Sequence, residues 1–148
     1  MTQEEKDLLL KDLCARLKYG VKIQTPADCW TSEEEIRELK EIFKGDDGLF
    51  RIGDVGSLIE YSKPYLFPLS SMTEEQKKEI SKRYNYHNYY GLYYIEITNH
   101  SEGYWDNDTS CNLQDYLWLE DWYNKNHFDY RGLIEKGLAI DATGKHIY

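Results

Sequence analysis

Apolar residues in the first part of the chain recur at helical spacing. Leucines and one cysteine return every three or four positions from Leu9 to Leu17, which is the pattern of an amphipathic helix with one apolar face. Ahead of them, Thr2 and Glu5 have the spacing of a capping box, in which each side chain satisfies a backbone N–H at a helix start. The pattern therefore predicts a helix over residues 3–17 that docks on the core.

The residues after this helix alternate between apolar and polar. Val21 and Ile23 alternate with polar neighbours between Gly20 and Pro26, and an alternation of this kind predicts a short strand with one face buried. β-Branched and aromatic residues, which favour strands, also gather further along the chain. They predict additional short strands at three places, namely residues 58–61, 91–98 and 138–140.

Residues 31–44 fit two different structures. Their apolar positions have helical spacing, which predicts a helix. However, "GDDG" at residues 45–48 is a strong turn signal, and the "LFRI" after it has the composition of a strand. The competing prediction is therefore a hairpin that pairs residues 35–43 with residues 49–53.

Two further helices are predicted in the second half of the chain. Thr73 and Gln76 form a second capping box, which predicts a helix over residues 74–84 with lysines and an arginine on its exposed face. Asn112 is expected to cap a helix over residues 113–125. A short helical turn around residues 130–136, closed by Gly137, and a polar loop at residues 99–111 complete the prediction.

These elements predict an α+β fold. We expect a small antiparallel sheet or a partly open barrel, packed by the N-terminal helix and two or three further helices. The 148 residues correspond to a single domain over residues 1–148, with a tyrosine-rich variable insert at about residues 84–111. No apolar run approaches the ~18 residues of a membrane span, and the charged start is not a signal peptide, so a cytoplasmic protein is expected.

Charge and cysteine usage exclude several classes of protein. The net charge of −9 opposes binding of DNA or RNA, because phosphate recognition needs clustered Lys and Arg. The three cysteines are far apart and lack a C-x-x-C spacing, so they indicate neither a disulfide framework nor a zinc site.

A tyrosine-rich segment follows the second predicted helix. Six of the eleven residues from Tyr84 to Tyr94 are tyrosine, and residues 84–124 contain no Lys or Arg, seven acids and three of the four tryptophans. Aromatic side chains offer large contact area at low entropy cost and anchor many binding sites. Exposed aromatics rimmed with acids suit a basic protein surface, an organic cation or a sugar. We therefore predict a water-facing patch that is free of positive charge.

Three other stretches resemble one known group of proteins. They are "MTQEEKDLLLKDLCARLKYGVKI" at residues 1–23, "KPYLFPLSSMTEEQ" at residues 63–76 and "NKNHFDYRGLIEKGLAID" at residues 124–141. Together they resemble a family of small uncharacterised proteins of phages and prophages of gut bacteria. The resemblance implies short central strands ahead of "KPYL", which favours the hairpin at residues 35–53, and it brings no assigned activity. The tyrosine-rich insert departs from the common pattern, which implies that function lies there.

The sequence contains no recognisable catalytic or metal motif. Its four histidines are not accompanied by a nucleophile elbow such as G-x-S-x-G. Asp106, Asp108 and Ser110 imitate the start of a calcium loop, but Cys111 replaces the required glycine and Leu117 replaces the final acid. We therefore expect a protein that is not an enzyme and that has no cofactor and no metal ion.

The segment "HFDYRGLIEKG" allows two interpretations. Tyr130 and Arg131 lie close together in sequence with Phe128, and such a group could stack a base and hold a phosphate. In the structural interpretation, which we favour, Asp129 caps a short helix, Phe128 and Leu133 belong to the core, and Arg131 pairs with a nearby acid.

Three functions fit these observations. The first is a non-catalytic phage-type accessory protein that binds a host protein, as an inhibitor of a defence system. Its partner-binding residues would be Tyr86, Tyr89, Tyr90, Tyr93, Tyr94, Tyr104, Trp105, Asp106 and Asp108.

The alternative is a protein that sequesters a small nucleotide immune signal. Its binding pocket would be completed by neighbouring elements or by a second subunit of a homo-oligomer. Its ligand-binding residues would be Lys78, Lys82, Arg83, Tyr130 and Arg131. The third is a structural or regulatory phage component without a discrete ligand.

Overall fold

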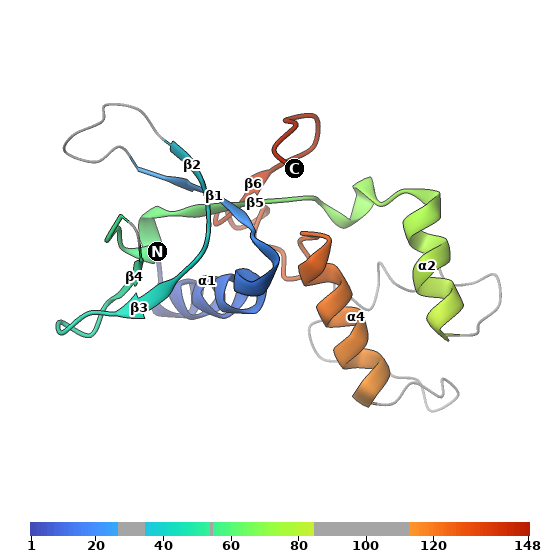
Figure 1. Cartoon of the computed structure of the whole chain (residues 1–148), viewed down its shortest axis with the longest axis horizontal. Coiled ribbons are helices and arrows are strands. Elements are labelled where there is room, and N and C mark those ends of the chain that lie inside the picture. The colour runs from blue at the N-terminus through green and yellow to red at the C-terminus, as the bar shows by residue number, and fades with distance from the viewer. Residues whose placement is uncertain (27–34, 54, 85–112) are drawn as a thin grey trace.

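The computed structural model describes residues 1–26, 35–53, 55–84 and 113–148 (Figure 1). The chain begins with helix α1 (Gln3–Arg16), which has the predicted capping box at Thr2 and Glu5. The Thr2 hydroxyl accepts a hydrogen bond from the Glu5 N–H at 3.2 Å, and the Glu5 carboxylate accepts one from the Thr2 N–H at 2.7 Å. These bonds satisfy backbone donors that the helix leaves without intrahelical partners. The prediction of an N-terminal helix is confirmed.

A four-stranded sheet packs on α1 in the strand order β2-β1-β5-β6. The strands are β1 (Lys22–Thr25), β2 (Glu35–Glu38), β5 (Lys63–Leu66) and β6 (Ile140–Asp141). β1 pairs antiparallel with β2 and β5, whereas β5 and β6 are parallel. The fold is α+β, as predicted, but the sheet is mixed. A parallel neighbour is possible because the long chain path between β5 and β6 supplies the crossover that parallel strands need.

The hairpin prediction is confirmed for its inner part. β3 (Ile42–Lys44) pairs antiparallel with β4 (Phe50–Ile52) around the "GDDG" turn. At the turn, the Gly45 N–H donates to the Leu49 carbonyl at 2.8 Å. The outer residues behave differently, because β2 pairs with β1 instead of continuing the hairpin. The competing prediction of a helix is wrong for the described residues of this region.

The predicted strand at residues 58–61 is wrong. Ile59–Tyr61 is a 3₁₀ helix, η2, and Leu58 makes only a single bridge to Arg51. The Tyr61 N–H donates to the Leu58 carbonyl at 3.1 Å, and the Ser62 N–H donates to the Ile59 carbonyl at 3.0 Å. A strand-favouring composition over four residues is too short a signal to tell a turn from a strand, and here these local bonds stabilise the turn.

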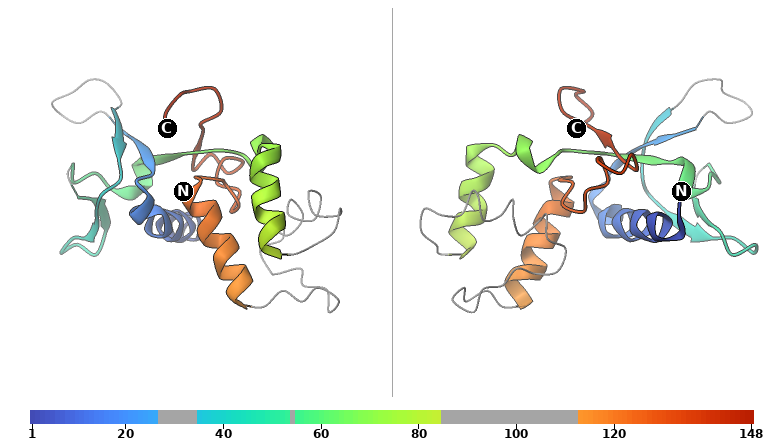
Figure 2. Two further views of the ribbon diagram at one scale, coloured as in Figure 1. Left: turned by 45° about the vertical axis from the view of Figure 1, so that its right-hand side comes forward. Right: turned by 180° about the vertical axis from the view of Figure 1, so that it is seen from behind.

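Two hydrophobic clusters form the core. The first joins α1, the sheet and the turns at residues 133–139, around side chains that include Leu9, Leu13, Ile23 and Leu66. The second joins α2 (Glu74–Tyr84) and α4 (Leu113–Lys125), and contains Met72, Ile80, Leu119, Trp122, Tyr123 and Phe128. Figure 2 shows α2 and α4 side by side, away from β2, β3 and β4. Both helices have their predicted boundaries.

The remaining predictions concern segments at the margins of this fold. The turns around residues 130–136 end at Gly137, whose φ of +69° is readily adopted only by glycine. The strand at 91–98, the loop at 99–111 and the Asn112 cap lie outside the described residues. In the part of the chain that the structure describes, every helix is too short or too polar to cross a bilayer.

Candidate functional site at the junction of α1 and α4

A buried ion pair on α1 lies at the junction between α1 and α4. Asp12 and Arg16 are one helical turn apart, and both side chains are fully buried. Arg16 donates to both carboxylate oxygens of Asp12, at 2.7 Å from Nε and 3.0 Å from Nη2. The same guanidinium donates to the carbonyls of Phe128 at 2.7 Å and Tyr123 at 3.4 Å. One side chain therefore fastens α1 to the C-terminal end of α4.

Arg131 brings a second guanidinium to the same carboxylate. Its Nη1 donates to Asp12 at 2.8 Å and to the side-chain oxygen of Asn124 at 3.4 Å, and its Nη2 donates to Glu120 at 2.6 Å. Only 9% of its side chain is exposed. A guanidinium engaged by two carboxylates has few donors left for a phosphate. The expected pairing of Arg131 with a nearby acid is confirmed.

Tyr130 is enclosed by the same groups. Its ring stacks on Tyr123 at 5.3 Å between centroids and lies under the guanidinium carbons of Arg131 at 4.3 Å and Arg16 at 5.7 Å. Its hydroxyl donates to Glu120 at 3.0 Å. Burial raises the pKa of this phenol. The ring is thus packed among protein groups and is poorly placed to stack on a nucleotide base.

The neighbouring residues match the structural interpretation in part, because residues 130–137 form turns and not the expected short helix. Asp129 accepts hydrogen bonds from the N–H groups of Leu133 and Ile134, both at 2.8 Å. Burial raises the pKa of the Asp129 carboxyl, and the two hydrogen bonds oppose that effect. Phe128 and Leu133 lie in the core. This segment therefore organises the fold around the end of α4.

Two acids on α4 have cationic partners. Lys18, in the 3₁₀ helix η1 (Leu17–Tyr19), contacts Asp121 at 2.8 Å, and the hydrogen bond from Lys18 lowers the pKa of that carboxyl. Arg131 holds Glu120. The predicted absence of positive charge from this region is therefore wrong for α4, because folding brings cations to it from outside residues 84–124.

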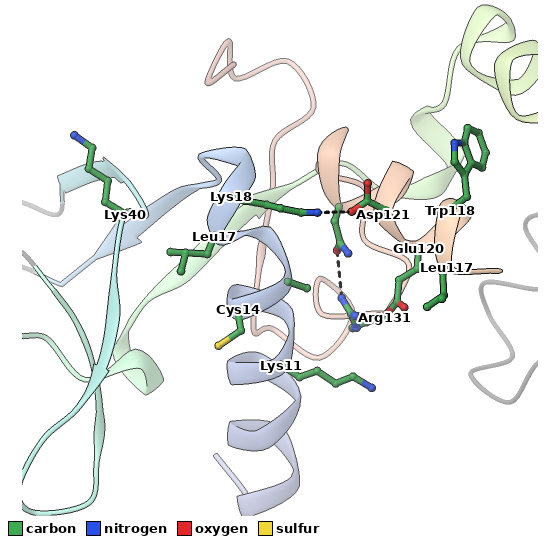
Figure 3. A pocket seen from close by; sticks show the side chains of 12 residues that line it. Lys11, Cys14, Leu17, Lys18, Lys40, Leu117, Trp118, Glu120, Asp121 and Arg131 are labelled. Carbon is green, nitrogen blue, oxygen red and sulfur yellow. Dashed lines mark hydrogen bonds and ion pairs between the residues drawn. The ribbon is translucent and has the colours of Figure 1, made fainter. Parts of the chain in front are cut away.

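An open groove of about 1090 Å³ runs along the junction (Figure 3). Lys11 and Cys14 line it from α1, and Leu117 and Trp118 line it from α4. Leu117 is 47% exposed. Burial raises the pKa of the Cys14 thiol, and the groove has no histidine among its described lining residues. The groove offers apolar and charged contacts but no activated nucleophile.

The structure separates the residues predicted for ligand binding. Arg131 lines the groove, whereas Lys78 is exposed on α2 and is not part of the lining. Lys82 and Arg83 belong to the last turn of α2, and their side chains are outside the described part. The aromatic and acidic residues predicted for partner binding also lie outside the described residues, namely Tyr86, Tyr89, Tyr90, Tyr93, Tyr94, Tyr104, Trp105, Asp106 and Asp108.

Asp12 and Arg16 are not among the residues predicted for the site. Both lie on the same helical face as Leu9 and Leu13, at positions where solvent-facing charges do not belong. Charged residues are almost never fully buried unless they are paired. The sequence signal for this pair was therefore an acid and an arginine four residues apart on the apolar face of a helix.

Comparison of the chain with known protein families, curated proteins and solved structures finds no match. Across the described ranges, no three His, Cys, Asp or Glu side chains are grouped in a way that could hold a metal ion.

Proposed function

We propose that the protein is a non-catalytic, phage-type accessory protein that binds a host protein through residues 84–124. The observation that carries this proposal is the arrangement of the two helices on either side of the tyrosine-rich segment. The last residue of α2 and the first residue of α4 lie at the same end of this antiparallel pair (Figures 1 and 2). Both ends of the segment are thus held by one packed unit.

The helix pair is well suited to serve as a scaffold for the tyrosine-rich segment. Ile80 of α2 and Leu119 of α4 are almost fully buried in one cluster. Trp122 stacks on Phe128 with ring centroids 5.7 Å apart and an interplanar angle of 6°. Binding loops are most effective when a rigid scaffold holds them, because less conformational entropy is lost on binding.

The described part of the binding region offers one apolar contact of its own. Leu117 is exposed on α4, next to the partly buried Trp118 and one turn before Asp121. An exposed apolar residue of this kind resembles the centre of a protein interface. Asp121 already pairs with Lys18, so this part of α4 supports contact with apolar side chains of a partner.

The test is affinity capture from host lysate, followed by mass spectrometry. The triple variant Tyr89→Ala, Tyr93→Ala and Trp105→Ala should lose the captured protein, because the aromatic anchors are removed. Tyr61→Ala is the matched control, since Tyr61 is 62% exposed but lies on η2. The triple variant must also show the circular dichroism spectrum of the unmodified chain. Undiminished capture by the triple variant would contradict the proposal.

A second candidate function is sequestration of a small nucleotide signal. It is favoured by the cationic side chains of the groove, which are Lys11, Lys18, Lys40 and Arg131. It is opposed by the pairing of Lys18 and Arg131 with acids. Isothermal titration with a panel of linear and cyclic nucleotides separates the two functions. Binding heat that disappears in Lys11→Glu would support sequestration, and the absence of heat with all nucleotides would eliminate it.

A further inference from the structure

We infer that β2 is a self-association edge, through which a second copy of this chain extends the four-stranded sheet. β2 is the terminal strand in the order β2-β1-β5-β6, and no described strand pairs with its outer side. Ile36 stands on this strand with 52% of its surface exposed. Unpaired strand edges are templates for the addition of another strand.

The register of β2 on β1 determines which backbone groups of β2 point outward. The Leu39 N–H donates to the Val21 carbonyl at 2.9 Å, and Arg37 faces Ile23. Inward and outward groups alternate along an antiparallel strand. The N–H and C=O of residues 35, 37 and 39 therefore serve β1, whereas those of Ile36 and Glu38 point to the outer side.

This alternation limits the ways in which two copies can pair. In a two-fold antiparallel arrangement, residues that face each other across the new pair must both have outward backbone groups or both lack them. The two-fold axis therefore passes through a residue that faces its own copy. The candidate centres within the strand are Glu35, Ile36, Arg37 and Glu38.

Charge selects one of these centres. Pairing centred on Glu35, Arg37 or Glu38 would place like charges directly opposite each other, which destabilises a strand pair. Pairing centred on Ile36 places Ile36 against Ile36 and makes Glu35 face Arg37 of the second copy, twice by symmetry. Glu35 and Arg37 already pair within one strand, so each carboxylate would lie between two guanidinium groups.

The same register predicts that the association is weak. β2 begins at Glu35, so pairing centred on Ile36 joins only residues 35–37 of the two copies. Three residue pairs bury much less than the ~1,000 Å² typical of a stable interface. We expect a dimer that becomes populated only at roughly millimolar chain concentration.

Sedimentation velocity on the full chain, at concentrations up to roughly 1 mM, tests the inference with two charge reversals. Glu35→Arg and Arg37→Glu should each remain monomeric, because each creates repulsion against its own copy. A mixture of the two variants should dimerise again, because both pairs between positions 35 and 37 are then of opposite charge. Lys63→Glu, an exposed residue on β5, is the matched control and should associate like the unmodified chain.

Two results would overturn the inference. The first is an unmodified chain that stays monomeric over the whole concentration range. The second is a dimer whose single variants still associate, or whose mixture of variants does not, since either outcome places the interface elsewhere on the molecule.

Discussion

The described part of the chain contains the same kind of ion pair twice, in two different surroundings. Asp12 and Arg16 on α1, like Asp47 and Arg51 at the β3–β4 hairpin, are four residues apart and share two hydrogen bonds. The α1 pair has no exposed side-chain surface. In the hairpin pair, Asp47 is 47% and Arg51 25% exposed. The pairs therefore differ in burial and not in chemistry.

This difference determines what each pair does for the fold. Water solvates an exposed ion nearly as well as its partner does, so a surface pair adds little stability. A buried ion that loses its partner cannot recover its solvation, and the whole cost falls on the folded state. The α1 pair also serves Arg131 and thereby joins the sheet side of the molecule to the helix pair. The hairpin pair stabilises one turn.

Asp12→Asn should have the largest effect. The substitution leaves Arg16 and Arg131 buried without their shared carboxylate, and breaking a buried pair in this way costs about 3–5 kcal/mol. Urea unfolding followed by circular dichroism measures the free energy of unfolding. If Asp12→Asn lowers the free energy of unfolding no more than Asp47→Asn does, burial does not distinguish the two pairs.

Arg131→Met should have the next largest effect. Arg131 joins Asp12 to Glu120 through charged hydrogen bonds, whose loss costs about 1.5–3 kcal/mol. A double-mutant cycle with Glu120→Gln, measured by the same unfolding experiment, isolates the contact between α4 and the turn after it. A coupling energy near zero would mean that this ion pair does not hold the junction.

His127 provides a pH-dependent test of burial at the same junction. Burial, with smaller contributions from Arg16 and Lys22, lowers the pKa of its imidazole to about 4. Above the ordinary pKa of 6.5 the imidazole is neutral in both the folded and the unfolded chain. Between pH 6.5 and about 4 only the unfolded chain takes up the proton, so the folded state loses stability as the pH falls through this range.

The variant His127→Asn removes the titrating group. Asparagine suits the left-handed backbone at this position, where φ is +59°. Urea midpoints of both proteins should be compared at roughly pH 7 and pH 5. The midpoint of the unmodified chain should fall more between these two values than that of the variant. Equal decreases would show that the imidazole is accessible to protons in the folded state.

Asp47→Asn should have the smallest effect. The hydrogen bond from Arg51 holds the pKa of Asp47 well below its usual range, so the carboxylate stabilises the fold above the usual pKa of an aspartate. That contribution is lost as the pH falls below this range. Because the pair is exposed, high salt should remove most of the difference between the variant and the unmodified chain in the unfolding midpoint. If Asp47→Asn lowers the free energy of unfolding as much as Asp12→Asn does, the conclusion that burial distinguishes the two pairs is wrong.

Local sequence signals predicted much of the secondary structure. Both capping boxes are present, since the Gln76 side chain accepts a hydrogen bond from the Thr73 N–H at 2.8 Å and the Thr73 hydroxyl accepts one from the Gln76 N–H at 3.3 Å. The "GDDG" turn forms the hairpin because its glycines and aspartates favour tight turns. The failed strand at residues 58–61 shows the limit of such signals, since the composition of four residues carries too little information.

The site was harder to predict than the fold. Arg131 was correctly expected to pair with an acid, but the identity of that acid could not be read from its neighbours. Asp12 is 119 positions away in sequence. Likewise, the sequence between residues 84 and 124 has no cation of its own, yet Lys18 reaches Asp121 from 103 positions away. Contacts of this kind depend on the path of the whole chain.

The sequence by itself determined the start of α1, the start of α2 and the turn between β3 and β4. Each of these depends on hydrogen bonds between residues at most four positions apart, which form wherever the chain goes next. Only the tertiary structure decided which acids are buried, which cations reach α4 and how β6 joins β5. Those outcomes follow from how the two hydrophobic clusters pack, because packing sets both the distance between charges and their access to water.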